Sequence, residues 1–161
     1  QFNNVKMLCD SASSAKNIGC KKFVSTGTVT ENIVQDIFTR PMAGKSEMYA
    51  VAKNAGHQAL DILCKDIGLS YVWAQLSNVY GENNKTGNIV SYTLMKLKNG
   101  ERPEFTKAEQ PYDLIYVEDV AHALYLIGRV KLKKNQYFTW LMPIGVRIVK
   151  ILRRLPSETQ K

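Results

Sequence analysis

The sequence predicts an α/β fold in which helices alternate with parallel strands. Apolar residues recur at helical spacing over residues 5–18, and Gly19 follows where a helix would end. Residues 22–26 then form a short apolar strand that runs on to Val29, and a second apolar strand over residues 69–76 follows another helix. The order helix, strand, helix, strand favours parallel strands joined by right-handed crossovers.

The helix between these two strands has the clearest pattern in the chain. Ser46 is placed to cap it, Glu47 falls in its first turn, and Gly68 follows its end. Its apolar residues form one stripe along the helix, made of Met48, Val51, Ala52, Ala55, Ala59, Ile62 and Leu63. The preceding residues 30–45, which include Pro41 and Gly44, are predicted to be a loop.

The second half of the chain continues the alternation less regularly. After a loop over residues 77–88, the pattern predicts a helix over residues 89–98 that ends at Asn99-Gly100. A short apolar segment at residues 112–116, a helix at 119–127 and a strand at 136–139 follow. We therefore expect one domain over residues 1–139, and a basic tail over residues 140–161 that is interrupted by Pro143 and Pro156.

The charge of the chain is concentrated near its end. The formal net charge is +8, and nine lysines or arginines between residues 129 and 161 face one acidic residue, Glu158. Aromatic residues do not alternate with basic ones as in single-strand nucleic-acid binders, so we expect a solvated tail and no nucleic-acid partner.

The cysteines and histidines indicate neither disulfides nor a metal site. Cys9, Cys20 and Cys64 form no Cys-x-x-Cys pair and have no metal-ligand spacing with His57 or His122. No signal segment and no apolar run long enough to cross a bilayer is visible, so we expect a cytoplasmic protein without stable membrane insertion.

Tyr49 and Lys53 are the residues best placed to do chemistry. Their spacing of four puts both side chains on one face of the predicted helix, one turn apart. An ammonium beside a phenol stabilises the phenolate and so allows a tyrosine to act as general acid or base. Thr26, at the carboxyl end of a parallel strand, could donate a hydrogen bond to the same substrate oxygen. Tyr-x-x-x-Lys also occurs by chance in helices, as a half-buried ring beside a solvated charge.

Four segments in order resemble the extended short-chain dehydrogenase/reductases, in the NAD-dependent sugar-nucleotide epimerase/dehydratase branch. They are Lys-Phe-Val-Ser-Thr-Gly-Thr-Val at 22–29, Met-Tyr-Ala-Val-Ala-Lys at 48–53, Leu-Ser-Asn-Val-Tyr-Gly at 76–81 and Tyr-Asp-Leu-Ile-Tyr-Val-Glu-Asp-Val at 112–120. The resemblance covers most of residues 3–128, and it implies a partial Rossmann-like parallel sheet with helices plus part of a small substrate-binding lobe.

The resemblance also assigns roles to individual residues. Thr26, Tyr49 and Lys53 would be catalytic, and Tyr49 and Lys53 would also contact the cofactor, NAD or NADP. Asn78 would contact a nucleotide-sugar substrate, and the loop through Asn88 would border its nucleotide. Such enzymes often pair as homodimers through the helix that carries the tyrosine.

The chain departs from the family pattern in several places. Its ten glycines form no Gly-x-Gly-x-x-Gly cluster, so the segment that holds the cofactor pyrophosphate is absent and we expect the chain to be inactive alone. Gln75 stands near a frequent arginine, His57 where glutamate is common, and Tyr112 where arginine is frequent.

Two other readings fit the sequence. The same Thr/Tyr/Lys site could reduce a steroid-like or other small carbonyl compound. Alternatively, the chain could be a non-catalytic fragment that binds acidic partners or a membrane surface through residues 140–161.

Overall fold

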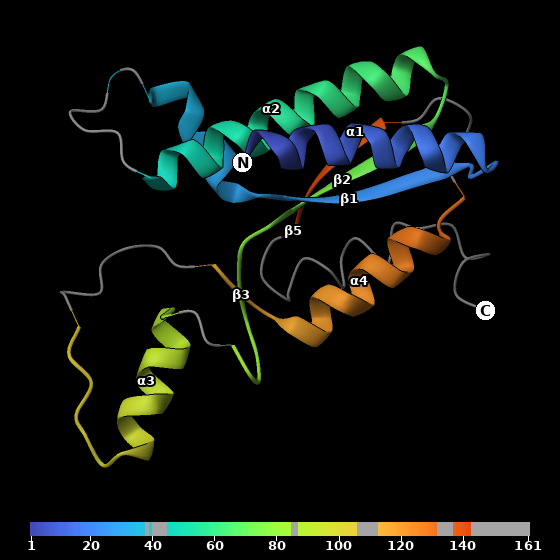
Figure 1. The fold of residues 1–161 in the computed structure, drawn as a ribbon. Coiled ribbons are helices and arrows are strands. Elements are labelled where there is room, and N and C mark those ends of the chain that lie inside the picture. The colour runs from blue at the N-terminus through green and yellow to red at the C-terminus, as the bar shows by residue number, and fades with distance from the viewer. Residues whose placement is uncertain (38, 40–44, 85–86, 106–112, 132–136, 143–161) are drawn as a thin grey trace.

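The computed structural model describes residues 1–37, 39, 45–84, 87–105, 113–131 and 137–142 (Figure 1). Along the chain the elements are α1 (Phe2–Asn17), β1 (Lys22–Thr28), the 3₁₀ helix η1 (Val29–Asp36), α2 (Lys45–Asp66), β2 (Ser70–Leu76), β3 (Asn78–Tyr80), α3 (Ile89–Lys98), β4 (Leu114–Tyr116), α4 (Val117–Arg129) and β5 (Tyr137–Met142).

The central sheet is parallel, as the alternation of helices and strands predicted. Its described strands lie in the order β1-β2-β5. Thr26 of β1 is paired with Ala74 of β2, and Trp73 of β2 is paired with Thr139 of β5. Since β1 and β2 are joined through α2, their carboxyl ends lie at the same edge of the sheet, which is where open α/β folds gather their ligands.

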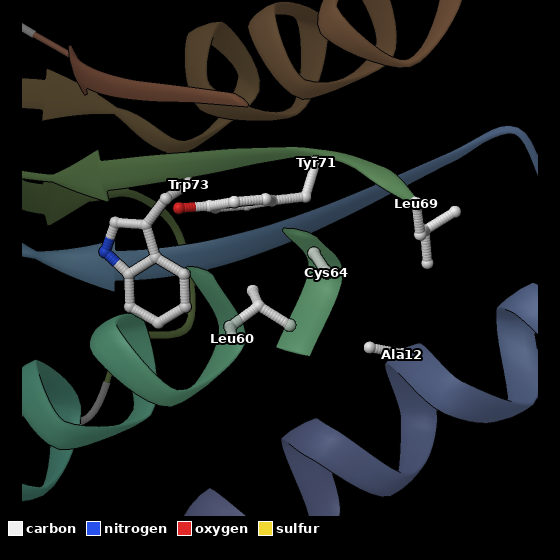
Figure 2. Packing of buried hydrophobic residues seen from close by; sticks show 6 residues of the cluster. All are labelled: Ala12, Leu60, Cys64, Leu69, Tyr71 and Trp73. Atoms are coloured by element: carbon white, nitrogen blue, oxygen red, sulfur yellow. The ribbon is translucent and has the colours of Figure 1, made fainter. Parts of the chain in front are cut away.

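Helices cover both faces of this sheet. In Figure 1, α1 and α2 lie side by side on one face, and α4 lies on the other. The core under α1 and α2 is a cluster of buried residues: Ala12, Leu60, Cys64, Leu69, Tyr71 and Trp73. Figure 2 shows Leu60 and Cys64 of α2 facing Tyr71 and Trp73 of β2. Ala74, the next residue of β2, instead packs in a second cluster with Ile115, Val120 and Ala123, as strand alternation requires.

A smaller part of the chain lies beyond the carboxyl end of the central sheet. Residues Asn78–Tyr80 of β3 pair in parallel with Leu114–Tyr116 of β4. The helix α3 stands apart from the central sheet in Figure 1. The family resemblance implied part of a small substrate-binding lobe, and the assignment of this region to such a lobe stays a prediction.

Three local predictions were wrong. Residues 30–45 were expected to be a loop, but η1 occupies Val29–Asp36, because Thr28 and Glu31 form a capping box that starts a helix. Ser46 does not precede α2, which begins at Lys45. The predicted loop 77–88 contains β3, which could not be seen from local sequence because its partner β4 lies far along the chain.

Other boundaries agree with the predicted elements. Gly19 and Gly68 follow α1 and α2 with φ of 86° and 63°, a backbone conformation that favours glycine. The strand expected at residues 136–139 is β5 and extends to Met142. Pro41, Gly44, Tyr112 and residues 143–161 of the predicted tail lie outside the described residues. None of the helices in the described ranges is both long and apolar enough to cross a membrane.

Candidate functional site

A direct contact joins the end of β1 to α2. The Lys53 Nζ donates a hydrogen bond of 3.0 Å to the backbone oxygen of Thr26. Both residues are half-buried. The structure therefore brings together two of the three predicted catalytic residues, through the main chain of Thr26.

A cavity of about 310 Å³ lies beside this contact, between α1, α2 and β1. Its wall includes Thr26 and Lys53, together with Asn4, Ser25 and Trp73. The sequence prediction passed over Asn4 and assigned Trp73 only to the core. The alternation of β1 could have indicated Ser25, because this residue is paired with the inward-facing Trp73.

Tyr49 lies one helical turn before Lys53 on α2 and is 39% exposed. The cavity wall, as far as the described residues define it, includes Lys53 and Thr26 but not Tyr49. The Tyr49 side chain is therefore exposed and does not line the cavity that Lys53 and Thr26 share.

A buried carboxylate lies directly behind this site. Glu31 is 2% exposed and accepts hydrogen bonds from the Thr28 backbone N–H at 2.6 Å and from the Gln75 amide at 3.2 Å. The Trp73 indole N–H also lies 3.1 and 3.2 Å from its two oxygens. The His57 Nδ1 is 3.3 Å from the same carboxylate, and its ring stacks on Trp73 with 4.6 Å between centroids.

Two opposing effects act on this carboxyl group. Burial alone would raise the pKa of Glu31, but hydrogen bonds from His57, Thr28, Gln75 and Trp73 outweigh burial and lower it. Glu31 is therefore held as a carboxylate. The sequence analysis did not single it out, although Thr28-x-x-Glu31 matches the capping-box pattern.

The predicted substrate contacts lie in the smaller part of the fold. Asn78 is exposed, and its side-chain amide donates to the Asp113 carbonyl at 3.2 Å. The Asn88 side chain caps α3 by accepting from the Ser91 backbone N–H at 2.8 Å. Both asparagines thus have structural contacts, and their role toward a substrate stays a prediction.

Within the described residues, no group of three histidine, cysteine or acidic side chains is arranged to hold a metal ion. Of the two histidines that the sequence analysis considered, His57 packs against Glu31 and Trp73, while His122 is exposed on α4.

Comparison with known proteins identifies the family. The NAD dependent epimerase/dehydratase family matches residues 2–138. The chain belongs to this family. Its members use NAD, in agreement with the predicted nicotinamide cofactor.

Individual proteins are also similar to this chain. A segment of 53 residues is 42% identical to CDP-abequose synthase of Salmonella muenchen and covers 33% of this chain and 18% of that protein. The UDP-N-acetylglucosamine 4-epimerase of Methanobrevibacter ruminantium M1, in complex with UDP-N-acetylmuramic acid, superposes with a TM-score of 0.69 at 23% identity, over 93% of this chain and 51% of that chain.

The UDP-glucuronic acid 4-epimerase of Bacillus cereus, in complex with UDP-glucuronic acid and NAD, gives a TM-score of 0.63 at 16% identity, over 84% of this chain and 45% of that one. These likenesses confirm the partial Rossmann-like α/β fold. The chain spans about half the length of the solved structures and about a fifth of the curated relative.

Proposed function

We propose that this chain carries the proton-transfer part of an NAD(P)-dependent enzyme that acts as oxidoreductase, epimerase or dehydratase on a nucleotide sugar. Thr26, Tyr49 and Lys53 are its catalytic residues. The observation that supports this most strongly is the hydrogen bond from Lys53 to the Thr26 carbonyl, beside a cavity at the carboxyl edge of a parallel sheet.

The cavity fits one end of a nicotinamide cofactor. Its volume of about 310 Å³ is at the lower end of the range for ligand pockets, enough for a ring and part of a sugar but not for a dinucleotide. Lys53 supplies a cation and Ser25 a hydroxyl on its wall, which suits the hydroxyls of a ribose. The family resemblance assigns both Tyr49 and Lys53 to the binding of NAD or NADP, and of the two it is Lys53 that lines this cavity.

The chemistry needs a proton and a hydride to leave the same sugar carbinol. A bound nicotinamide would supply the hydride-transfer chemistry. The Tyr49 side-chain oxygen would take the proton of the sugar hydroxyl as its carbon becomes a carbonyl, and would return the proton in the reverse step. Lys53 would supply a positive charge one helical turn from Tyr49, and Thr26 would orient the substrate oxygen.

A nucleotide sugar is the substrate class that we propose. The lobe that begins at Asn78 and continues through Asn88 to α3 would border the nucleotide. The related CDP-abequose synthase and the two UDP-sugar epimerases support this choice.

A thermal-shift screen tests the substrate class. The full reading frame that contains this chain would be tested with NAD against UDP- and CDP-sugars, and in parallel against steroid-like carbonyl compounds. We expect stabilisation by nucleotide sugars. Stabilisation by the carbonyl compounds alone would refute the proposed substrate.

The 161-residue chain alone would bind cofactor weakly, because it has no glycine-rich loop for the pyrophosphate. We expect titration with NADH, followed by its fluorescence, to give an affinity weaker than the micromolar range. Low-micromolar binding would contradict this expectation and show that the loop is dispensable.

We also propose that two copies pair through the helix that carries Tyr49. Met48 and Ile62 on α2, Met7 on α1 and Ile18, which follows α1, are each more than half exposed although apolar. Sedimentation should show a dimer that Ile62→Glu dissociates, while an unchanged dimer would rule out this face.

Cys9, Cys20 and Cys64 are free thiols, which supports a reducing, cytoplasmic location.

A further inference from the structure

Glu31 connects three elements that meet behind the candidate site. Its carboxylate accepts from the backbone of Thr28, the last residue of β1, and from the side chains of Trp73 and Gln75 on β2. It also lies 3.3 Å from His57 on α2. A carboxylate that is 2% exposed, with four groups directed at it, is a strong and geometrically fixed anchor.

Gly27 of β1 leaves room for the Glu31 carboxylate beside the strand. A Cβ at Gly27 would lie 2.1 Å from the Trp73 Nε1 and 2.4 Å from a Glu31 oxygen. The carboxylate and the indole therefore pack directly against the backbone of β1, at the residue next to Thr26. A displacement of Glu31 would therefore change the packing against β1 at Gly27.

The anchor acts on the two halves of the Lys53–Thr26 contact. Thr28 is two residues after Thr26 on the same strand, and His57 is four residues after Lys53, which places it one turn along the same side of α2. One carboxylate thus fixes the strand end that carries the acceptor oxygen and the helical turn that follows the donor ammonium.

We propose that Glu31 is a positioning residue, which holds the Thr26 carbonyl and the Lys53 ammonium in hydrogen-bonding register through Thr28 and His57. Its importance for catalysis rests on the proposed function. The positioning itself can be tested without cofactor or substrate.

The test is the reactivity of individual lysines toward an acylating reagent, measured by mass spectrometry on the native 161-residue chain. Lys53 should react slowly, because its amine is held on the Thr26 carbonyl. Glu31→Ala should raise its rate about two- to tenfold, the factor that corresponds to losing one net hydrogen bond. Glu31→Gln keeps the size and one acceptor oxygen, and should restore part of the protection.

Two other lysines serve as controls that distinguish the positioning of Lys53 from a general loosening of the fold. Lys22 also donates to backbone carbonyls, those of Ile127 and Val130, on the α4 side of the sheet. Lys98 is exposed on α3 and serves as the reference for reagent activity. The matched variant Glu118→Ala removes an exposed carboxylate from the first turn of α4 and should leave Lys53 unchanged.

A selective rise at Lys53 in Glu31→Ala, with Lys22 and Lys98 unchanged, supports the proposal. An unchanged Lys53, or a parallel rise at Lys22, overturns it. If Glu31→Ala does not fold, His57→Gln, which alters a half-buried side chain, must give the selective rise instead. If the reactivity of Lys53 rises selectively but the protein binds neither NAD nor a nucleotide sugar, the positioning role stands and only the proposed function is refuted.

Discussion

Replacing Gly27 with alanine tests the packing of the carboxylate anchor against β1. The new Cβ would meet the Trp73 Nε1 at 2.1 Å and a Glu31 oxygen at 2.4 Å. To lengthen the distance between the new Cβ and the Trp73 Nε1 to 3.0 Å, the indole must move by about 0.9 Å. A close-packed interior resists such a displacement.

The cost follows from two effects. Overpacking of this kind costs about 1–3 kcal/mol. Loss of a hydrogen bond to the buried Glu31 carboxylate adds about 1.5–3 kcal/mol. We therefore expect Gly27→Ala to lower the free energy of unfolding by about 2.5–6 kcal/mol, a large part of the stability of a typical domain.

Urea unfolding followed by circular dichroism measures this change, and the chain offers a matched control. Gly128 lies in α4, and a Cβ there would meet nothing within 4 Å. Gly128→Ala should be neutral or stabilise the protein by up to about 1 kcal/mol, because alanine favours the helix. A Gly27→Ala protein within about 0.5 kcal/mol of wild type would refute the close packing of Glu31 and Trp73 on β1.

Three further predictions follow from the core and its titratable groups. Leu60 is fully buried between α2 and β2, so Leu60→Ala should cost about 2–5 kcal/mol in the same urea assay, and a cost under about 1 kcal/mol would contradict the described core. Burial, with smaller effects of Cys9 and Asp61, raises the pKa of Cys64 to about 11; iodoacetamide should therefore label exposed Cys20 well before Cys64, and equal rates would show that Cys64 is accessible. The pKa of Glu31 is lowered in the folded protein, so its contribution to stability is full above the unfolded-state pKa and is lost as the pH falls through the folded-state pKa. Glu31→Gln should therefore make the free energy of unfolding depend less on pH in the acid range, and a pH profile of unchanged shape would refute this linkage.

The regular elements were largely predictable from the sequence because their signals are local. The helix predicted at residues 89–98 is α3, whose start is fixed by the Asn88 cap. The strand predicted from Lys22 onward is β1, and its parallel pairing with β2 follows from the helix between them. The apolar stripe predicted for α2 was right for Leu63, which packs against the core, but wrong for Met48 and Ile62, which are exposed. It also missed Leu60 and Cys64, which are fully buried.

The elements and contacts that were missed depend on residues far apart in the chain. β3 exists because Asn78–Tyr80 meets Leu114–Tyr116, and three residues alone carry no strand signal. The four contacts of Glu31 come from the end of β1, from β2 and from α2, so no local pattern could show that this carboxylate is buried. Lys53 was predicted to lie near Thr26, but its hydrogen bond to the backbone oxygen is a tertiary detail.

The central claim of this account is that Tyr49 exchanges a proton with a sugar hydroxyl at a site completed by Lys53 and Thr26. It is tested most directly in the full reading frame that contains this chain, by the rate at which a nucleotide sugar reduces NAD. We predict that Tyr49→Phe slows this rate about 10²- to 10⁴-fold, while Tyr125→Phe, on the exposed side of α4, leaves it unchanged. A Tyr49→Phe enzyme that turns over at the wild-type rate would contradict the account.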